Sequence, residues 1–230
     1  MNLPNALTVG RIAITPLIAV LPFAPATTPR LIAFILFLFA AGSDYADGVL
    51  ARSRKQETTL GKLLDPLADK LLLVGTFIPM WALMQSGNGL FSGSSFGTND
   101  LSLRSLPFLT PWGEMGLPWW IIVIVLGREL VMTIFRQAAA RRGVVIAAIG
   151  PAKVKTGFQL LWQGTAYLWF VVATAALQHN WNARAWRGIA LFIGTAGTVM
   201  MSVAVMLTLF SLWLYMSRYG RLFVQSRARS

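Results

Sequence analysis

The segment Asp44-Tyr45-Ala46-Asp47-Gly48-Val49-Leu50-Ala51-Arg52 is followed, after eight residues, by Gly61-Lys62-Leu63-Leu64-Asp65-Pro66-Leu67-Ala68-Asp69. Each segment carries two aspartates, three residues apart in the first and four in the second, so each pair lies on one face of a helix. If the chain turns back near residues 55–59, Asp44 meets Asp69 and Asp47 meets Asp65, because each pair is nearly equidistant from the turn. The sequence therefore predicts four carboxylates converging between two helices.

These four aspartates lie within apolar stretches, where an ionised carboxylate costs roughly 2.5–3.5 kcal/mol on insertion scales. Neighbouring carboxylates also repel one another, so either protonation or bound cations must compensate for their charge. Ligands that offer only oxygen favour Mg²⁺, Mn²⁺ or Ca²⁺ over zinc. We therefore expect two divalent ions at this point.

Small residues accompany the aspartates. Gly48, Ala51 and Gly61 lie within about one helical turn of an acidic residue and leave room for a ligand. Arg52 lies where an anionic ligand brought by the metals would meet it. The alternative is structural, because glycine and alanine also serve close helix packing in membranes and Arg52 would then only flank the membrane.

The composition shows whether this chain is suited to water or to a lipid bilayer. Of its 230 residues, 56% are hydrophobic and only 12% charged, with a mean hydropathy of +0.62, against about 25% charged residues in soluble proteins. This excludes a soluble globule. The absence of cysteine excludes disulfides, thiol catalysis and iron–sulfur clusters. The net charge is +12, and the basic residues lie between hydrophobic runs. This distribution favours anionic membrane lipids or an anionic substrate as partners and argues against nucleic acid.

Six apolar stretches of about the length that spans a membrane predict an all-α integral membrane bundle of six transmembrane helices in a single domain, 1–230. They fall near residues 6–24, 31–52, 62–85, 118–140, 156–178 and 187–216. The start of the chain has neither a basic region nor a cleavage site of a signal peptide. We therefore expect the first stretch to remain as a membrane helix.

The distribution of Lys and Arg predicts the orientation. Thirteen lie on the side of the termini and of the loops after the second and fourth helices, and four lie on the opposite side. Because cytoplasmic loops carry the excess of positive charge, both termini are expected in the cytoplasm. Residues 86–117 then form an extracytoplasmic loop, to which we assign no chemistry.

The two quoted segments resemble the signature of the CDP-alcohol phosphatidyltransferase family at every fixed position. The resemblance implies an enzyme that moves a phosphatidyl group from a CDP-linked lipid to an alcohol and releases CMP. It implies two Mg²⁺ or Mn²⁺ ions, with Asp69 both a metal ligand and the catalytic acceptor of the hydroxyl proton. The implied metal ligands are Asp44, Asp47, Asp65 and Asp69, and the implied CDP-binding residues are Asn5, Thr8, Gly48, Ala51, Arg52 and Gly61.

Three further stretches resemble the bacterial members of this family that form phosphatidylglycerophosphate. They are Asn2 to Thr8 with Arg11, Asp65 to Leu71, and Gly127-Arg128-Glu129 through Lys153 to Thr156. This resemblance implies CDP-diacylglycerol as donor, glycerol 3-phosphate as acceptor, a homodimer, and a multi-pass location in the bacterial cytoplasmic (inner) membrane with the active site facing the cytoplasm. Ala152 stands where that branch usually has glycine, and the 86–117 loop is longer than usual.

The acceptor's phosphate needs cations of its own. Arg128 and Arg136 lie eight residues apart, about two turns along one helix face, and Lys153 and Lys155 open the next helix. We expect these four residues to bind the phosphate, with the arginines making bidentate contacts. The alternative for Arg128 is a pairing with Glu129 or with an acid on another helix.

Two other functions are compatible with the same pattern. The first is the same transfer to another acceptor, inositol phosphate or phosphatidylglycerol. The second is a cation-coupled transporter, because intramembrane aspartates also mark ion pathways. Transport requires acids distributed across the depth of the membrane, whereas these aspartates gather near one side.

Overall fold

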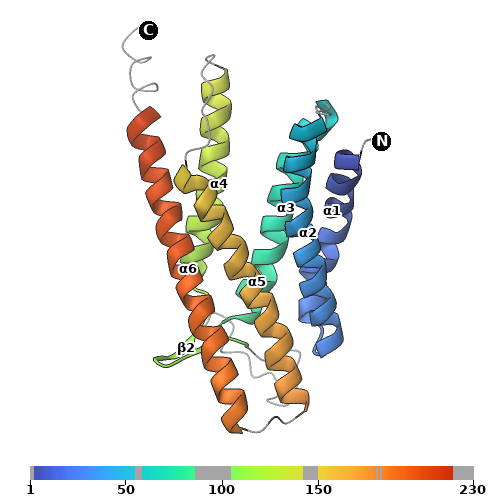
Figure 1. The fold of residues 1–230 in the computed structure, drawn as a ribbon. Helices are drawn as coiled ribbons and strands as arrows, with labels where there is room; N and C mark the ends of the chain where they lie inside the picture. Colours follow the sequence, from blue (N-terminus) through green and yellow to red (C-terminus); the bar gives the residue numbers. More distant parts are fainter. Residues whose placement is uncertain are drawn as a thin grey trace. The chain divides into compact units, whose positions relative to one another are not determined.

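The computed structural model describes residues 3–54, 59–85, 105–141, 150–179, 181 and 183–219. In these ranges the chain forms six α-helices, one short 3-10 helix and a two-stranded hairpin (Figure 1). The helical elements are α1 (Leu3–Val20), η1 (Leu21–Phe23), α2 (Thr27–Arg54), α3 (Thr59–Leu83), α4 (Trp119–Ala140), α5 (Gly150–Gln178) and α6 (Ala183–Tyr219), and the strands are β1 (Phe108–Thr110) and β2 (Gly113–Met115). The predicted helical class is confirmed, with one helix in each predicted stretch.

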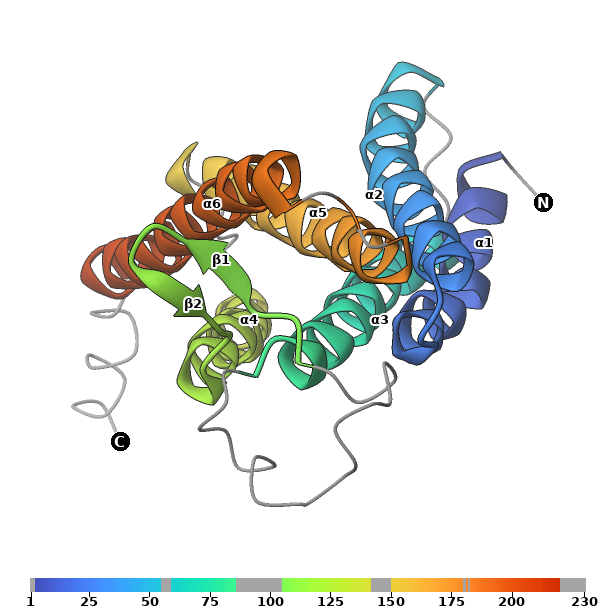
Figure 2. The ribbon, with the colours of Figure 1, turned by 90° about the horizontal axis from the view of Figure 1, so that it is seen from below.

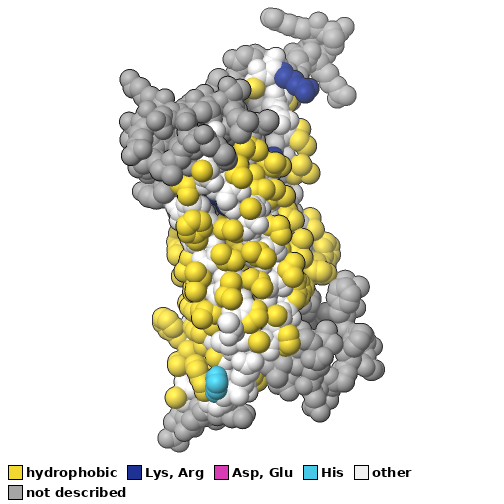
Figure 3. Space-filling view, turned by 90° about the vertical axis from the view of Figure 1, so that its right-hand side faces the viewer, with side chains coloured by type: hydrophobic (Ala, Val, Ile, Leu, Met, Phe, Trp, Pro, Cys, Tyr) yellow, Lys and Arg dark blue, Asp and Glu magenta, His cyan; other side chains and the backbone are white. Residues whose placement is uncertain are grey.

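Four helices are long and apolar enough to cross a membrane, through the segments Asn5–Phe23, Leu64–Leu83, Val154–Gln178 and Ala185–Tyr219. Figure 3 shows one face of the molecule, where hydrophobic side chains cover most of the described surface. Large apolar side chains are exposed on the helices, among them Ile35, Phe39, Ile134, Phe192 and Met206. Such a surface is stable in lipid and not in water, so the chain is a multi-pass membrane protein. The number of spans, six, and the side of the termini stay predictions.

The chain divides into two compact units. The first unit comprises residues 1–117 and 163–197, and the second comprises residues 118–162 and 198–230. The helices α5 and α6 each contribute one part to the first unit and one part to the second. The single-domain organisation therefore stays a prediction, and the two units are described in turn.

In the first unit, α1 packs against both α2 and α3 (Figure 2). The buried positions of α1 are Thr8, Arg11, Thr15 and Ile18, at intervals of three and four residues, which place them along one stripe of the helix. Three of these four side chains are polar. The face of α1 that is buried in protein is thus more polar than its exposed face, as expected for a helix whose outer solvent is lipid.

Residues 108–115 form an antiparallel hairpin that the sequence did not predict. Phe108 pairs with Met115, and Thr110 pairs with Gly113, so the loop contains only two residues. Gly113 has a φ of 119°, a backbone conformation that favours glycine. The ring of Phe108 lies 6.3 Å from that of Trp169, which anchors the hairpin to α5.

The hairpin also lies close to α6. A Cβ atom at Gly194 would overlap the backbone of Leu109, and a Cβ atom at Gly197 would overlap the ring of Phe108. The two glycines lie three residues apart on one face of α6, and their missing side chains make room for β1. The end of the expected 86–117 loop is therefore an ordered part of the first unit.

Candidate active site

The segment Gly61 to Asp69 places two carboxylates on one face of α3. Asp65 and Asp69 lie one turn apart in this helix, and both residues are exposed at its surface. The side chain of Asp69 is 55% exposed. Both carboxylates can therefore be reached from outside the protein core.

Two buried side chains of α1 donate hydrogen bonds to these carboxylates. The hydroxyl of Thr8 donates to Oδ1 of Asp65 at 2.8 Å, and Nη1 of Arg11 donates to Oδ1 of Asp69 at 2.9 Å. Thr8 and Arg11 lie three residues apart on α1 and are each 1% exposed, so both donors have fixed positions. The helix α1 thus orients both aspartates, and the guanidinium of Arg11 offsets part of their negative charge.

A glycine allows this close approach of α1 to α3. A Cβ atom at Gly75 would lie 2.8 Å from Cγ2 of Thr15 and 3.7 Å from Cβ of Ala19. The hydroxyl of Thr15 donates to the carbonyl oxygen of Arg11, so the α1 turn that touches Gly75 also supports Arg11. Gly75 and Asp69 lie six residues apart on α3. The absent side chain therefore helps to set the distance across which Arg11 reaches Asp69.

The other residues of the signature that were predicted for this site lie on α2 and at the start of α3. The structure describes their backbone but not their side chains. Asp44, Asp47, Gly48, Ala51 and Arg52 lie on the C-terminal part of α2, and Gly61 lies in the first turn of α3. The predicted meeting of four carboxylates thus falls outside the described side chains, and among those described no group of three or more His, Cys, Asp or Glu forms. Asn5 lies one turn before Thr8 on α1 and is half-buried.

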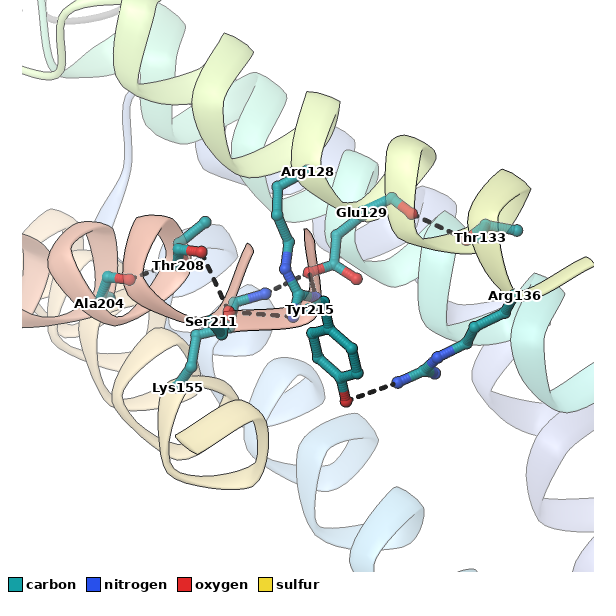
Figure 4. A network of polar contacts seen from close by, with 9 residues as sticks. All are labelled: Arg128, Glu129, Thr133, Arg136, Lys155, Ala204, Thr208, Ser211 and Tyr215. Carbon is teal, nitrogen blue, oxygen red and sulfur yellow. Dashed lines mark hydrogen bonds and ion pairs between the residues drawn. The ribbon is translucent and has the colours of Figure 1, made fainter. Parts of the chain in front are cut away.

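The second unit contains a network of cations, of which Arg128 and Lys155 are buried and Arg136 is exposed (Figure 4). Nη1 of Arg128 lies 3.0 Å from Oε1 of Glu129, and Nζ of Lys155 pairs with the same oxygen. Nη2 of Arg128 donates to the hydroxyl of Ser211 on α6 at 3.1 Å. The helices α4, α5 and α6 each supply a member of this network.

Arg136 extends the network along α4. Its Nη2 atom donates to the hydroxyl of Tyr215 at 3.5 Å, and its guanidinium carbon lies 5.9 Å from the centre of the same ring. Ser211 and Tyr215 lie one turn apart on one face of α6. This face contacts the face of α4 that carries Arg128 and Arg136. The side chain of Lys153, the fourth predicted phosphate ligand, lies outside the described residues.

The family model described as CDP-alcohol phosphatidyltransferase matches residues 1–224 of the chain. The chain belongs to the CDP-alcohol phosphatidyltransferase family. A CDP-diacylglycerol–glycerol-3-phosphate 3-phosphatidyltransferase of Bacillus subtilis is 29% identical over 229 residues, which cover 94% of each chain. The Escherichia coli protein of the same name is 26% identical and covers 94% of this chain and 93% of its own. A probable phosphatidylglycerophosphate synthase of Mycobacterium tuberculosis is 32% identical over 69% of this chain and 62% of its own.

CDP-alcohol phosphatidyltransferases use divalent metal ions. The two described aspartates fit this use. Their carboxylates are exposed, lie on one helix face and offer the oxygen ligands that hard cations prefer. Each carboxylate receives a hydrogen bond on Oδ1 from α1, and such bonds orient metal-binding carboxylates in proteins.

Several contacts of this transferase were not predicted from its sequence, among them the bond from Thr8 to Asp65 and the pairing of Lys155 with Glu129. Another is the pairing of Arg11 with Asp69, for which an available signal is the position of an arginine inside an apolar run, where it needs an acidic partner. The sequence also carries no signal for the hydroxyls of Ser211 and Tyr215. A serine hydroxyl within an apolar helix commonly bonds to its own backbone, and a tyrosine in an apolar run looks like one more aromatic core residue.

Proposed function

We propose that this CDP-alcohol phosphatidyltransferase transfers the phosphatidyl group of CDP-diacylglycerol to glycerol 3-phosphate in phospholipid biosynthesis. A hydroxyl oxygen of the acceptor forms a bond to the β-phosphorus, which carries the lipid, while the bond from that phosphorus to the oxygen of CMP breaks. The products are phosphatidylglycerophosphate and CMP. The names of the relatives that align over nearly the whole chain support this assignment.

The carboxylates belong to the donor side of this reaction. We assign Asp44, Asp47, Asp65 and Asp69 as ligands of two divalent ions, Mg²⁺ or Mn²⁺. When bound, such ions neutralise charge on the pyrophosphate and assist departure of the leaving group. The nucleotide is held by the remaining residues of the signature and of the start of α1, which are Asn5, Thr8, Gly48, Ala51, Arg52 and Gly61.

Asp69 accepts the proton of the attacking hydroxyl in this proposal. Its carboxylate is exposed to an incoming acceptor, and Arg11 fixes it by a bond to Oδ1. A general base needs both a defined position and access to the proton that it removes. Asp69 meets both conditions, and its exposed carboxyl group passes the proton to water before the next turnover.

The observation that carries the choice of acceptor is the cation network of the second unit. Three cations, Arg128, Arg136 and Lys155, outnumber its one carboxylate, Glu129, so the described network has a formal charge of about +2 with all four groups ionised. A phosphate monoester carries nearly two negative charges and no lipid anchor. Together with Lys153, this network suits an acceptor that binds through a phosphate.

The membrane location follows from the substrates and from the surface of the protein. The acyl chains of CDP-diacylglycerol remain in lipid, while glycerol 3-phosphate arrives from water. We place the protein in the bacterial cytoplasmic membrane with its active site facing the cytoplasm, where the excess of Lys and Arg favours the termini. A homodimer is the assembly that we expect.

The experiment that tests the function is release of CMP by the purified full chain in detergent with CDP-diacylglycerol and a panel of acceptors. Glycerol 3-phosphate should support release, whereas inositol phosphate and phosphatidylglycerol should not. Excess EDTA should abolish the reaction, and Mg²⁺ or Mn²⁺ should restore it. Turnover with another acceptor in place of glycerol 3-phosphate would overturn the acceptor assignment, and full turnover in EDTA would overturn the metal assignment.

A further inference from the structure

Glu129 holds the two buried cations of the second unit through one oxygen atom. Oε1 of Glu129 accepts from Nη1 of Arg128 and also from Nζ of Lys155. The side chain of Arg128 is 6% exposed and that of Lys155 is 2% exposed. A single anionic oxygen between an arginine and a lysine is the arrangement that an oxygen of a phosphate monoester makes when it binds to such a pair.

The network also has donor capacity that Glu129 does not fill. The buried Nε atom of Arg128 has no hydrogen-bond acceptor within the part of the chain that the structure describes. Buried guanidinium donors are nearly always satisfied in proteins. A carboxylate offers two oxygens, whereas a phosphate monoester offers three terminal oxygens, so a bound phosphate could serve Nε as well.

We propose that Glu129 is an internal substitute for the acceptor's phosphate, which occupies the phosphate position in the empty site and is displaced when a phosphate monoester binds. The inference rests on the proposed function for the identity of the acceptor. It adds a competing carboxylate to the phosphate site. Glu129 offsets one of the two positive charges of Arg128 and Lys155 between turnovers, and its departure on binding weakens the apparent affinity for phosphate.

The contacts around Glu129 make this exchange feasible. Its side chain is 31% exposed, far more than those of the cations that it pairs, so it can swing away from them. Arg128 keeps a second anchor in Ser211, whose own hydroxyl donates to the carbonyl oxygen of Thr208. The arginine therefore remains in place when Glu129 leaves. If Glu129 were needed to hold the cations in position, its removal would weaken phosphate binding. The proposal expects the opposite effect, which is tighter binding.

The test is the variant Glu129→Gln, in which glutamine keeps the size and an acceptor oxygen but removes the competing charge. Calorimetric titration of inorganic phosphate into the purified full chain in detergent gives its Kd. A charged hydrogen-bond partner changes affinity by about 10-fold or more, so the Kd for phosphate should fall by about that factor. The KM for glycerol 3-phosphate should fall in parallel, with the KM for CDP-diacylglycerol within about 2-fold of wild type.

The matched control is Glu114→Gln, which removes an exposed acid from β2 in the first unit and should leave the Kd for phosphate unchanged. An unchanged or higher Kd in Glu129→Gln would overturn the inference. If Glu129→Gln does not fold, Glu129→Asp replaces it, because a shorter carboxylate cannot reach both cations. Its Kd for phosphate should then fall by several-fold, and an unchanged value would equally overturn the inference.

The two proposals fail in distinguishable ways, because binding of phosphate requires no turnover. If the wild type releases no CMP with glycerol 3-phosphate while Glu129→Gln still binds phosphate more tightly, the acceptor assignment fails and the competing carboxylate stands. If the wild type turns over glycerol 3-phosphate while Glu129→Gln binds phosphate no better, only the inference about Glu129 fails.

Discussion

At the scale of single residues, the contacts between α1 and α3 connect the start of the chain to its signature. Thr8 and Arg11 each bond to one oxygen of an aspartate, so the orientation of the two carboxylates depends on side chains more than fifty residues away. An aspartate that must ligate metal and remove a proton gains from such orientation, because a correctly placed group loses less entropy in the transition state.

The variant Asp69→Asn tests the role of this residue. An amide oxygen still ligates metal weakly but cannot take a proton at neutral pH, so we expect kcat to fall by about 100-fold or more. The melting temperature should fall modestly, because the amide oxygen can still accept the bond from the buried Arg11 but no longer offsets its charge. CMP release measures the first quantity and thermal unfolding in detergent the second. A kcat near that of the wild type would remove Asp69 from the proton transfer, and Glu114→Gln controls for the loss of one acidic charge.

The variant Arg128→Ala tests the phosphate network. Loss of a charge-assisted contact should raise the KM for glycerol 3-phosphate by about 10-fold or more, while the KM for CDP-diacylglycerol moves little. The control is Arg141→Ala, which removes an exposed arginine just after α4 and should change neither value. Equal increases in both KM values, with a lower melting temperature, would instead assign Arg128 a structural role as the partner of Glu129.

Most charged residues of the candidate site could be predicted from sequence, whereas the hydroxyl partners on α6 could not. Asp65 and Arg128 stand out because an ion inside an apolar run needs a reason. The sequence also indicates a pairing of Arg128 with Glu129, and the structure contains this pairing together with that of Lys155 and Glu129. Ser211 gives no such signal, because its hydroxyl costs little in a membrane helix and its partner depends on how α6 faces α4.

At the scale of helices and strands, the close packing of α1 on α3 depends on Gly75. In Gly75→Ala the added methyl group would press on Thr15, and overpacking of this kind costs roughly 1–3 kcal/mol. We expect a lower melting temperature and a lower kcat, because α1 carries Arg11 to Asp69. Thermal unfolding and CMP release measure the two effects.

The matched control for this variant is Gly42→Ala in α2, where an added Cβ atom meets nothing within 4 Å. Alanine should be neutral or slightly stabilising there, since glycine costs a helix about 1 kcal/mol. Equal melting temperatures and equal kcat values of the two variants would show that the α1–α3 contact tolerates a methyl group. The role assigned to Gly75 would then be wrong.

The helices could be predicted because long apolar runs of spanning length have few alternatives in lipid. Their ends differ from the predicted ends by a few residues. Polar residues extend α2, α5 and α6 beyond the apolar run, whereas α1 and α3 end earlier than predicted. The hairpin at residues 108–115 escaped prediction for a physical reason. Each strand has only three residues, too few for an alternating pattern, and its stability comes from contacts with Trp169 and with the glycines of α6 that lie far away in the sequence.

At the scale of the whole molecule, composition was sufficient to predict a membrane protein, but hydropathy was not sufficient to count its spans. The helix α4 is as apolar as α3 on average, but it is not among the four candidate spans because three charged residues, Arg128, Glu129 and Arg136, lie within it. The residues that lower its hydropathy are the ones that build the network with α5 and α6. The charges of this network therefore obscure α4 as a possible span, whereas α3 is found despite Asp65 and Asp69.

The orientation in the membrane can be tested with single cysteines, since the chain has none of its own. Arg141→Cys, after α4, should react with an impermeant maleimide only from the cytoplasmic side. Glu114→Cys, in the hairpin, should react only from the opposite side. Both positions are exposed, so access is not limited by burial. Labelling of both from one side would refute the predicted topology.

The length of α6 has a consequence for the host membrane. Its 37 residues make a helix of about 55 Å at 1.5 Å per residue, whereas the hydrocarbon core of a bilayer is about 30 Å thick and the whole bilayer about 40–45 Å. Arg187, near its start, and Arg218, in its last turn, lie about 46 Å apart and can both reach a headgroup layer. A thinner bilayer forces α6 to tilt, and a thicker one draws an arginine toward hydrocarbon. The melting temperature in vesicles should therefore pass through a maximum as the acyl chains lengthen, which makes this enzyme responsive to the thickness of the membrane whose lipids it helps to build.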